Sequence, residues 1–598
     1  MIDLAATWVK SRALCFETAR SLLTRKHEST LPAHITTWAQ PILGHDIKGI
    51  CSVKKSNLRV NSGRILPAIM VLIILLLSAC SDSSNTSSSA LRASSLGVPG
   101  ASNDNVLPLT AALVEGPIDG APVLVGTFID LPGLGYTTET EYLVSGKASA
   151  YVNVNELQTD GKWEIAASET SDYKTRVVVI RPTDAAAFNG TVIVEWLNVS
   201  AGFDSPPDWL QAHTEITRSG FAWVGVSAQK VGVDALLDGT ACAINPTCVG
   251  PDRYASLALD HPGDFYSYDI FSQVAQALRT PGATSLLGNL EVSHIIAAGE
   301  SQSAGRMLTY VNAFAPVHAM FDGYLVHSRT AGSAGLQQEG IGICDVAIPT
   351  PDIVNVRDDL GVPTIMLQTE TDLFILGSYP DNQDDSDNFR LWEVAGSAHA
   401  DLYTFLLGRQ DDGTDPSFTA VSEEQIPVNF PPFTVIDCTP FPVNSGPQRL
   451  VVNAAFRALH NWIVDDIPAP RADRLEVAGN PAAFVKDEFG NTQGGVRTPY
   501  VDSPIAILEG EGQPQSDFSE IEGNCDINLD NVNFCFLSGT TSLFNANTLS
   551  TLYQSNEAYI EALNTATDEA VSKGFLLPED AALIKANAAN SNIFENAP

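Results

Sequence analysis

Positive charge is scarce in this chain: 33 Lys and Arg residues stand against 70 Asp and Glu residues, which gives a net charge of −37. Because basic residues outnumber acidic ones in the first 79 residues, the remainder is more acidic still. Such a surface repels nucleic acid phosphates and anionic lipids. The composition therefore argues against a nucleic-acid partner and suits a soluble body outside the cytoplasm.

Cysteine is sparse, and no cysteine pair has the tight C-x-x-C spacing of zinc ligands. No cluster of His and Asp has ligand spacing either, so we expect no metal and no cofactor. Apart from Cys15, Cys51 and Cys80 near the N-terminus, six cysteines remain, and an even number in an exported protein is typical of disulfides. Zinc binding is the rival interpretation. The expected disulfides are Cys242/Cys248, Cys525/Cys535 and, by remainder, Cys344/Cys438.

The segment "RILPAIMVLIILLLSAC" has the order of a secretory signal peptide. Arg59 lies shortly before this segment and Arg64 is its first residue. The apolar run that follows ends in small residues before Cys80. A cysteine directly after "LSA" resembles a bacterial lipoprotein signal, in which Cys80 carries the lipid that anchors the protein to the membrane. A transmembrane helix is the alternative, but the run is short for a full span and a Ser-rich tether follows it.

Apolar, β-branched runs alternate with helical patterns through the middle of the chain. Strand-like runs include "GTVIVEWLN", "FAWVGVSA", "VSHIIAAGE", "FDGYLVHS", "PTIMLQTE" and "FRLWEVAG", and helical spacing marks "DWLQAHTEITRSG" and "YDIFSQVAQALR". This alternation predicts an α/β fold with a mostly parallel central sheet and helices on both faces.

A central serine lies where one of these strands turns into a helix, in "AAGESQSAGRM". Strand, sharp turn and helix is how an α/β-hydrolase presents its nucleophile, which makes Ser301 the candidate. The usual pattern has glycine two residues after the serine, where this chain has Ser303. Because Ser303 is small, the exception weakens the motif without breaking it.

A serine hydroxyl needs a histidine to take its proton and a carboxylate to orient that histidine. His399 follows the strand "FRLWEVAG", whereas His460 lies inside a helical pattern and is expected to be structural. The acid should follow the preceding strand, where "PTIMLQTETDLF" offers two carboxylates. Spacing favours Asp372, and Glu370 is the alternative.

The negative charge that develops on the substrate oxygen requires two backbone donors. One should be the N–H of Gln302 at the start of the helix, where the helix dipole also contributes. The second should come from the loop after "GTVIVEWLNV", at Ala201 or Gly202.

Several segments together resemble the large bacterial α/β-hydrolase-domain proteins. They are "HPGDFYSYDIFSQVAQALR", "AAGESQSAGRMLTYVNAF", "AGSAHAD", "NTQGGVRTPYVDSPIA" and "FLSGTTSLFNANTLSTLY". The resemblance spans most of the chain from about residue 115 and implies a serine hydrolase without specifying its substrate.

We therefore expect an α/β-hydrolase fold with a cap-like insertion and a mixed C-terminal extension. The expected layout is a signal segment over 1–79, whose true start is expected near Val53, and a Ser-rich tether over 80–105. A hydrolase domain over 106–475 with a cap at 329–361 follows, and then an extension over 476–598 packed on that domain.

The expected activity is cleavage of carboxylic esters through an acyl-enzyme, by a lipid-anchored protein of the bacterial cell envelope or a secreted one. A small-molecule or polymeric ester is the expected substrate, and a lactonase or polyester depolymerase falls within the same chemistry. The alternative is a catalytically silent, surface-binding lipoprotein on a hydrolase scaffold, since a fold does not secure a function.

Overall fold

The computed structural model describes residues 107–598 with the exception of 121, 124–125, 244–251, 258, 340–347, 427–437, 514–533, 596 and 598. Residues Gly97–Pro598 form one compact unit. The expected signal segment, the lipid site Cys80 and the Ser-rich tether all lie outside the described residues, so these remain predictions.

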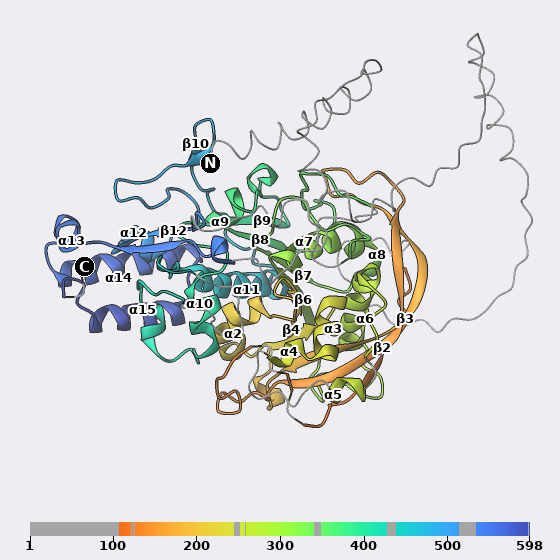
Figure 1. Ribbon diagram of the computed structural model, residues 1–598. Helices are drawn as coiled ribbons and strands as arrows, with labels where there is room; N and C mark the ends of the chain where they lie inside the picture. The colour runs from red at the N-terminus through yellow and green to blue at the C-terminus, as the bar shows by residue number, and fades with distance from the viewer. Residues whose placement is uncertain are drawn as a thin grey trace, which may run out of the picture. The chain divides into compact units, whose positions relative to one another are not determined.

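In the described residues, a sheet of nine strands forms the centre of this unit, in the order β1-β2-β3-β5-β4-β6-β7-β8-β9 (Figure 1). Pairing is parallel from β5 through β4 to β9 and antiparallel from β1 to β3 and between β3 and β5. The mostly parallel sheet is therefore as predicted, with an antiparallel end. The strands are β1 (Leu113–Glu115), β2 (Thr140–Asn153), β3 (Ile165–Ile180), β4 (Thr191–Trp196), β5 (Ala222–Val226), β6 (His294–Glu300), β7 (Gly323–His327), β8 (Thr364–Thr369) and β9 (Phe389–Val394).

The helices that follow the strands are close to the ranges that the apolar spacing predicts. The main helices of the hydrolase region are α2 (Pro207–Arg218), α3 (Lys230–Asp238), α6 (Ser267–Arg279), α7 (Gln302–Thr309) and α11 (Gln448–Asp465). Shorter ones are α4 (Thr240–Ala243), α5 (Asp252–Ala255), α8 (Ala315–His318), α9 (Glu370–Phe374), α10 (Leu402–Phe405) and α12 (Pro499–Asp502). A π-helical turn, Tyr310–Phe314, joins α7 to α8.

Alternate side chains of the central strands enter two different cores, one on each face of the sheet. In β4, Val192, Val194 and Trp196 join the core formed with α6 and α7. Ile193 and the following Leu197 point to the opposite core, formed with α2 and α11. Because both faces are covered, strands β4 to β9 are almost wholly buried, which explains their continuous apolar runs.

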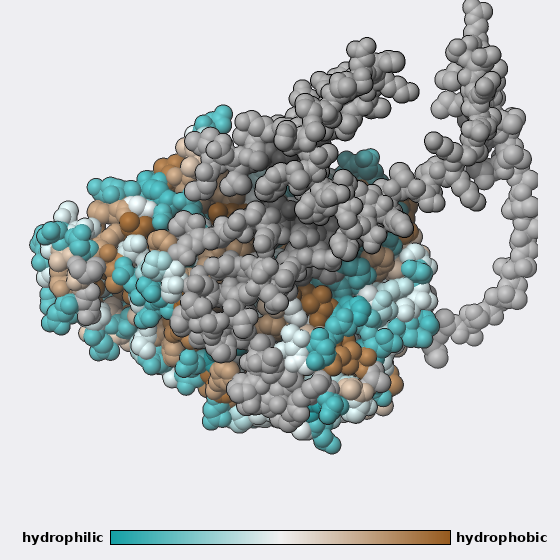
Figure 2. All heavy atoms as spheres, viewed as in Figure 1, coloured by the Kyte–Doolittle hydropathy of each residue, from teal (hydrophilic) through white to brown (hydrophobic). Residues whose placement is uncertain are grey.

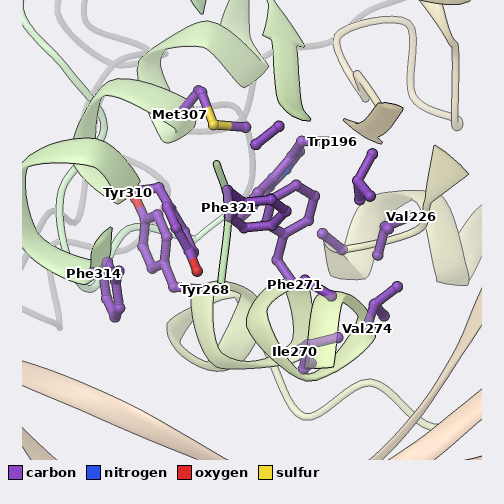
Figure 3. Packing of buried hydrophobic residues seen from close by; sticks show 14 of the residues in the cluster. Trp196, Val226, Tyr268, Ile270, Phe271, Val274, Met307, Tyr310, Phe314 and Phe321 are labelled. Atoms are coloured by element: carbon purple, nitrogen blue, oxygen red, sulfur yellow. The ribbon is translucent and has the colours of Figure 1, made fainter. Parts of the chain in front are cut away.

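Aromatic side chains fill the core on the α6 and α7 face (Figure 3). Trp196 of β4 packs against Phe271 of α6, with ring centroids 5.0 Å apart. Tyr268 of α6 stacks on Phe314 at 4.5 Å. These contacts fix α6 and the end of the α7 segment against the sheet.

The C-terminal part of the chain shares a core with the end of the sheet near β9. This core contains Leu373 and Ala395 beside C-terminal residues such as Leu508, Leu563 and Ile584. In Figure 1 the blue helices α13 (Ala546–Leu552), α14 (Asn556–Lys573) and α15 (Pro578–Asn590) lie at the opposite end from the long orange strands β2 and β3. Two small two-stranded antiparallel sheets belong to the described part of this region: β10 (Val477–Ala478) with β11 (Ala483–Phe484), and β12 (Ala506–Glu509) with β13 (Thr540–Leu543).

The segment expected to form a cap, 329–361, contains no helix or strand among its described residues. Arg329 at its start is fully buried and forms an ion pair with Asp381 at 2.8 Å. Further along, the N–H of Ala334 donates to the carbonyl of Gly305 in α7 at 3.1 Å. This part of the segment is therefore fixed against the helix that follows Ser301, and its role as a cap remains a prediction.

Large exposed hydrophobic side chains are scattered over distant parts of the described chain. They are Leu113, Phe128, Val154, Ile353, Val464 and Ile467. On the face drawn in Figure 2, hydrophobic and hydrophilic residues are intermixed. Within the described ranges, no helix has both the length and the hydropathy needed to cross a bilayer.

Candidate active site

Ser301 occupies a strained turn between β6 and α7. Its backbone has φ 59° and ψ −121°, in a region that residues with a side chain rarely adopt. The turn is tight because a Cβ added to Gly299 would lie 2.8 Å from the carbonyl oxygen of Ser303. Glycine is therefore required two residues before Ser301, at position 299. Two residues after Ser301, the turn accommodates the buried side chain of Ser303.

Three side chains, from the β6–α7 turn, from α9 and from the loop after β9, meet in a hydrogen-bonded chain at this turn. His399 Nε2 lies 2.8 Å from Ser301 Oγ, and His399 Nδ1 lies 2.6 Å from Asp372 Oδ1. Asp372 is fully buried and His399 is 3% exposed. The second oxygen of Asp372 accepts the backbone N–H of Thr369 at 2.6 Å, which fixes the carboxylate at the end of β8.

Glu370, the alternative acid, faces away from this chain of contacts. Its two oxygens accept the backbone N–H groups of Gly396 at 2.7 Å and Gly510 at 3.0 Å. The structure thus brings Asp372, not Glu370, to His399. His460 lies in α11 as expected, with its Nδ1 3.0 Å from the Thr191 hydroxyl.

The charge state of His399 depends on two carboxylates. Burial lowers its pKa, but the neighbouring Glu300 and Asp372 more than offset this, so the pKa of His399 is raised from its usual value. An imidazole in this position is therefore well suited to take up a proton.

Among the described residues, two of the expected oxyanion donors have an N–H group without a hydrogen-bond partner and one does not. Within the described residues, neither Gln302 nor Ala201 has a recorded partner for its backbone N–H. The Gly202 N–H instead donates to the carbonyl of Val199 at 2.9 Å, closing a turn in which Gly202 has φ 81°. The expectation that Gly202 is a donor is therefore wrong, because a turn bond uses its N–H.

Asn198 connects the loop after β4 to the serine turn. Its side-chain Nδ2 donates to the carbonyl of Glu300 at 3.1 Å and lies 3.3 Å from Glu300 Oε2. Its Oδ1 accepts the N–H of Ser200 at 2.8 Å. A single side chain thus fixes the loop that carries Ala201 relative to the residue that precedes Ser301.

The same loop is held from its other end by a buried ion pair. Asp204 contacts Arg176 of β3 at 2.8 Å and accepts the Ser227 hydroxyl. Arg176 also contacts Glu141 at 3.1 Å, and all these side chains are buried. Removing one partner would leave an uncompensated buried charge, so this contact strongly anchors the loop.

Glu300 is a site residue that sequence reasoning missed, although it directly precedes the serine. Its side chain is 6% exposed, and Oε1 lies 3.2 Å from His399 Nε2. Burial raises the pKa of Glu300 to about 7, against the opposing effects of His399 and His327. A carboxylate directly before the nucleophile was the signal available in the sequence.

A buried pair behind the turn was also missed. His327 Nδ1 lies 2.8 Å from Asp208 Oδ1, and Gln448 Nε2 lies 3.1 Å from His327 Nε2. The carbonyl of His327 accepts the N–H of Ser301 at 2.9 Å. Burial lowers the pKa of His327, but the hydrogen bond and charge of Asp208 leave it raised. The contact with Asp208 orients the imidazole and so helps to hold this backbone in place.

The cysteines pair differently from the expectation. Cys438 and Cys535 form a disulfide across 97 residues of sequence, which excludes the pairs Cys525/Cys535 and Cys344/Cys438. The error arose because short sequence spacing was taken as spatial proximity. Cys248, Cys344 and Cys525, together with the side chain of Cys242, lie outside the described residues, so Cys242/Cys248 remains a prediction.

The disulfide lies in a small core behind the loop that carries His399. Ala400, Leu402 and Phe405 pack in this core with the two cysteines. The N–H of Ala400 donates to the carbonyl of Leu537 at 3.1 Å. Within the described residues, no group of three or more His, Cys, Asp and Glu side chains is placed to hold a metal.

Comparison with other proteins gives structural similarities and a family. No curated protein matches this chain. Among solved structures, a methylesterase designated BT1017 is similar at 11% identity and a TM-score of 0.26, over 48% of this chain and 53% of that one. The chain thus covers about half of that methylesterase.

Two further solved structures cover a similar share of this chain. XC6422 from Xanthomonas campestris, described as an α/β serine hydrolase without a lid, has 15% identity and a TM-score of 0.22, over 41% of this chain and 83% of that one. Est1E from Butyrivibrio proteoclasticus has 12% identity and a TM-score of 0.22, over 41% and 88%. The family described as alpha/beta hydrolase domain matches residues 99–586, which is most of the chain. The chain therefore belongs to this alpha/beta hydrolase domain family.

Proposed function

We propose that this protein is a serine hydrolase that cleaves carboxylic esters through an acyl-enzyme. The observation that carries the proposal is the chain of contacts from Ser301 Oγ through His399 to Asp372, at 2.8 Å and 2.6 Å. The strained backbone of Ser301 supports it, because strain of this kind is found where a side chain must be presented for chemistry.

In the first half-reaction Ser301 Oγ attacks the carbonyl carbon of the ester while its proton passes to His399 Nε2. Asp372 accepts a hydrogen bond from Nδ1–H and stabilises the imidazolium that forms. The N–H groups of Gln302 and Ala201 are the donors proposed for the negatively charged oxygen, which Gln302 can stabilise further from the start of α7.

Collapse of the tetrahedral intermediate breaks the bond to the alcohol oxygen, which takes the proton from His399. The second half-reaction repeats these steps with water as the nucleophile, which releases the acid and restores Ser301. All three members of the triad are present and in contact, which argues against a catalytically silent scaffold.

Hydrolysis of p-nitrophenyl esters of different acyl chain lengths tests this proposal. Purified protein should hydrolyse some member of a series from acetate to palmitate, and Ser301→Ala should lose that activity while keeping its circular dichroism spectrum. Hydrolysis by Ser301→Ala at the rate of the unmodified protein would place the nucleophile elsewhere.

We further propose export, with lipid attachment at Cys80. This rests on the order of basic residues, apolar run and small residues before Cys80 in the sequence. An envelope location agrees with the disulfide Cys438–Cys535, because disulfides persist in oxidising compartments.

A further inference from the structure

A serine hydroxyl and a glutamate carboxyl group both contact the Nε2 atom of His399. Ser301 Oγ lies 2.8 Å from Nε2, and Glu300 Oε1 lies 3.2 Å from it. Asp372 already occupies the other ring nitrogen at 2.6 Å. The imidazole is therefore in contact with a carboxyl group at each of its nitrogens.

The position of Glu300 is fixed from both its backbone and its side chain. Its Cα pairs with that of His327 in the parallel register of β6 and β7. Asn198 Nδ2 lies 3.3 Å from Oε2, so one oxygen faces the Asn198 amide and the other faces His399. This side chain is 6% exposed, so water screens its charge poorly.

The charged groups around Glu300 come from four other elements. His399 and His327 lower its pKa, and Asp208 and Asp372 raise it. Asp208 is paired with His327 at 2.8 Å, and Asp372 is paired with His399. Within the described part of the chain, the Glu300 carboxyl group makes direct polar contacts with His399 and Asn198.

A neutral His399 and an ionised Glu300 are mismatched at this distance, because both atoms that face each other would be acceptors. One proton between Nε2 and Oε1 removes the mismatch. When Ser301 transfers its proton to Nε2, an ionised Glu300 accepts a hydrogen bond from the new N–H and stabilises the imidazolium.

We propose that Glu300 is a second carboxylate of the catalytic base, which shares the Nε2 proton of His399 and stabilises its imidazolium during acyl transfer. This proposal rests on the proposed serine hydrolase function. The step forms the Nε2–H bond as the Oγ–H bond of Ser301 breaks, and the same proton later passes to the leaving alcohol oxygen. Glu300 itself neither gains nor loses a proton over the full cycle.

Two consequences of this arrangement oppose each other. The negative charge of Glu300 keeps His399 protonated to a higher pH, which suppresses activity on the acid side. Where His399 is neutral at rest, the same charge favours the imidazolium that forms in the transition state and raises turnover. A residue with only a packing role would produce neither effect.

The test is Glu300→Gln, which keeps the shape of the side chain and removes its charge. Initial rates of p-nitrophenyl ester hydrolysis are followed by pH-stat titration, and rates of fluorophosphonate labelling are followed over the same pH range. We expect the plateau of kcat to fall roughly tenfold to a hundredfold, as when a charge-assisted hydrogen bond is lost. The acid limb of both profiles should move to lower pH.

Glu370→Gln is the matched control, because Glu370 is a buried carboxylate near the site that contacts backbone N–H groups and not His399. The acid limb of the pH–rate profile of Glu370→Gln should coincide with that of the unmodified protein. If the acid limb of the pH–rate profile of Glu300→Gln coincides with that of the unmodified protein, Glu300 has no role in the catalytic base and the proposal is overturned. If the unmodified protein shows neither labelling nor hydrolysis, the proposed function itself has failed.

Should Glu300→Gln fail to fold, ¹⁵N NMR of histidines in the unmodified protein gives an independent readout. The Nε2 signal of His399 should respond to two linked titration steps, one of its own and one of Glu300. A single step would contradict the sharing of a proton between them.

Discussion

Replacing Asp372 by Asn should abolish most turnover while leaving the fold intact. Asp372 Oδ2 accepts the N–H of Thr369 at 2.6 Å, and Oδ1 faces His399 Nδ1 at 2.6 Å. An asparagine can satisfy the Thr369 donor only with its oxygen, so its NH₂ group must face Nδ1. His399 then has to accept at Nδ1 and carry its proton on Nε2, where it cannot take a proton from Ser301.

The expected loss is about 10⁴-fold in kcat, the size that a wrong imidazole tautomer produces in a serine protease triad. This corresponds to about 5 kcal/mol of transition-state stabilisation. Hydrolysis of p-nitrophenyl esters by the purified variant measures the loss, and a urea unfolding curve shows whether the fold is retained.

Glu370→Gln is the comparison. Its amide would place an NH₂ group against one of two backbone N–H donors, which should lower the free energy of unfolding by about 1–3 kcal/mol. We expect about tenfold or less loss of turnover, through altered packing of the loop at Gly396. A larger loss of turnover in Glu370→Gln than in Asp372→Asn would refute the assignment of the acid.

Three further predictions concern the serine turn and the disulfide. Gly299→Ala should lower the free energy of unfolding by about 1–3 kcal/mol in urea titrations and reduce activity, because the new methyl group would overlap the carbonyl of Ser303. Ser303→Ala should leave both nearly unchanged, because the Ser303 hydroxyl is buried without a hydrogen-bond partner in the described structure; a large loss in this variant would refute that reasoning. Loss of the bridge in Cys438→Ser/Cys535→Ser should lower the free energy of unfolding by about 4 kcal/mol, since it closes a long loop, and unfolding curves that coincide with those of the unmodified protein would contradict this.

The sheet could be predicted because its strands are buried on both faces. Runs such as "TVIVEW" in β4 and "TIMLQT" in β8 are apolar along most of their length, which is the pattern that a covered parallel sheet imposes. The antiparallel pairing of β1, β2 and β3 at one end of the sheet was not predicted. The long hairpin of β2 and β3 is mixed in polarity, because much of the strand surface near its tip is exposed.

Ser301, His399 and Asp372 could be nominated from the sequence because the order of strands fixes where their loops emerge. Contacts that depend on side-chain direction could not be predicted. The role of Asn198, the pair of His327 with Asp208, and the disulfide across 97 residues all join segments far apart in sequence. Gly202 was assigned wrongly because only the structure shows that its N–H closes a turn.

Covalent labelling by a fluorophosphonate probe tests the central claim most directly. Peptide mass spectrometry of the labelled protein should find one modified residue, Ser301, and loss of ester hydrolysis should follow the extent of labelling in equal proportion. Ser301→Ala should not be labelled under the same conditions. Labelling at another serine, or ester hydrolysis that persists after Ser301 is fully modified, would contradict the account.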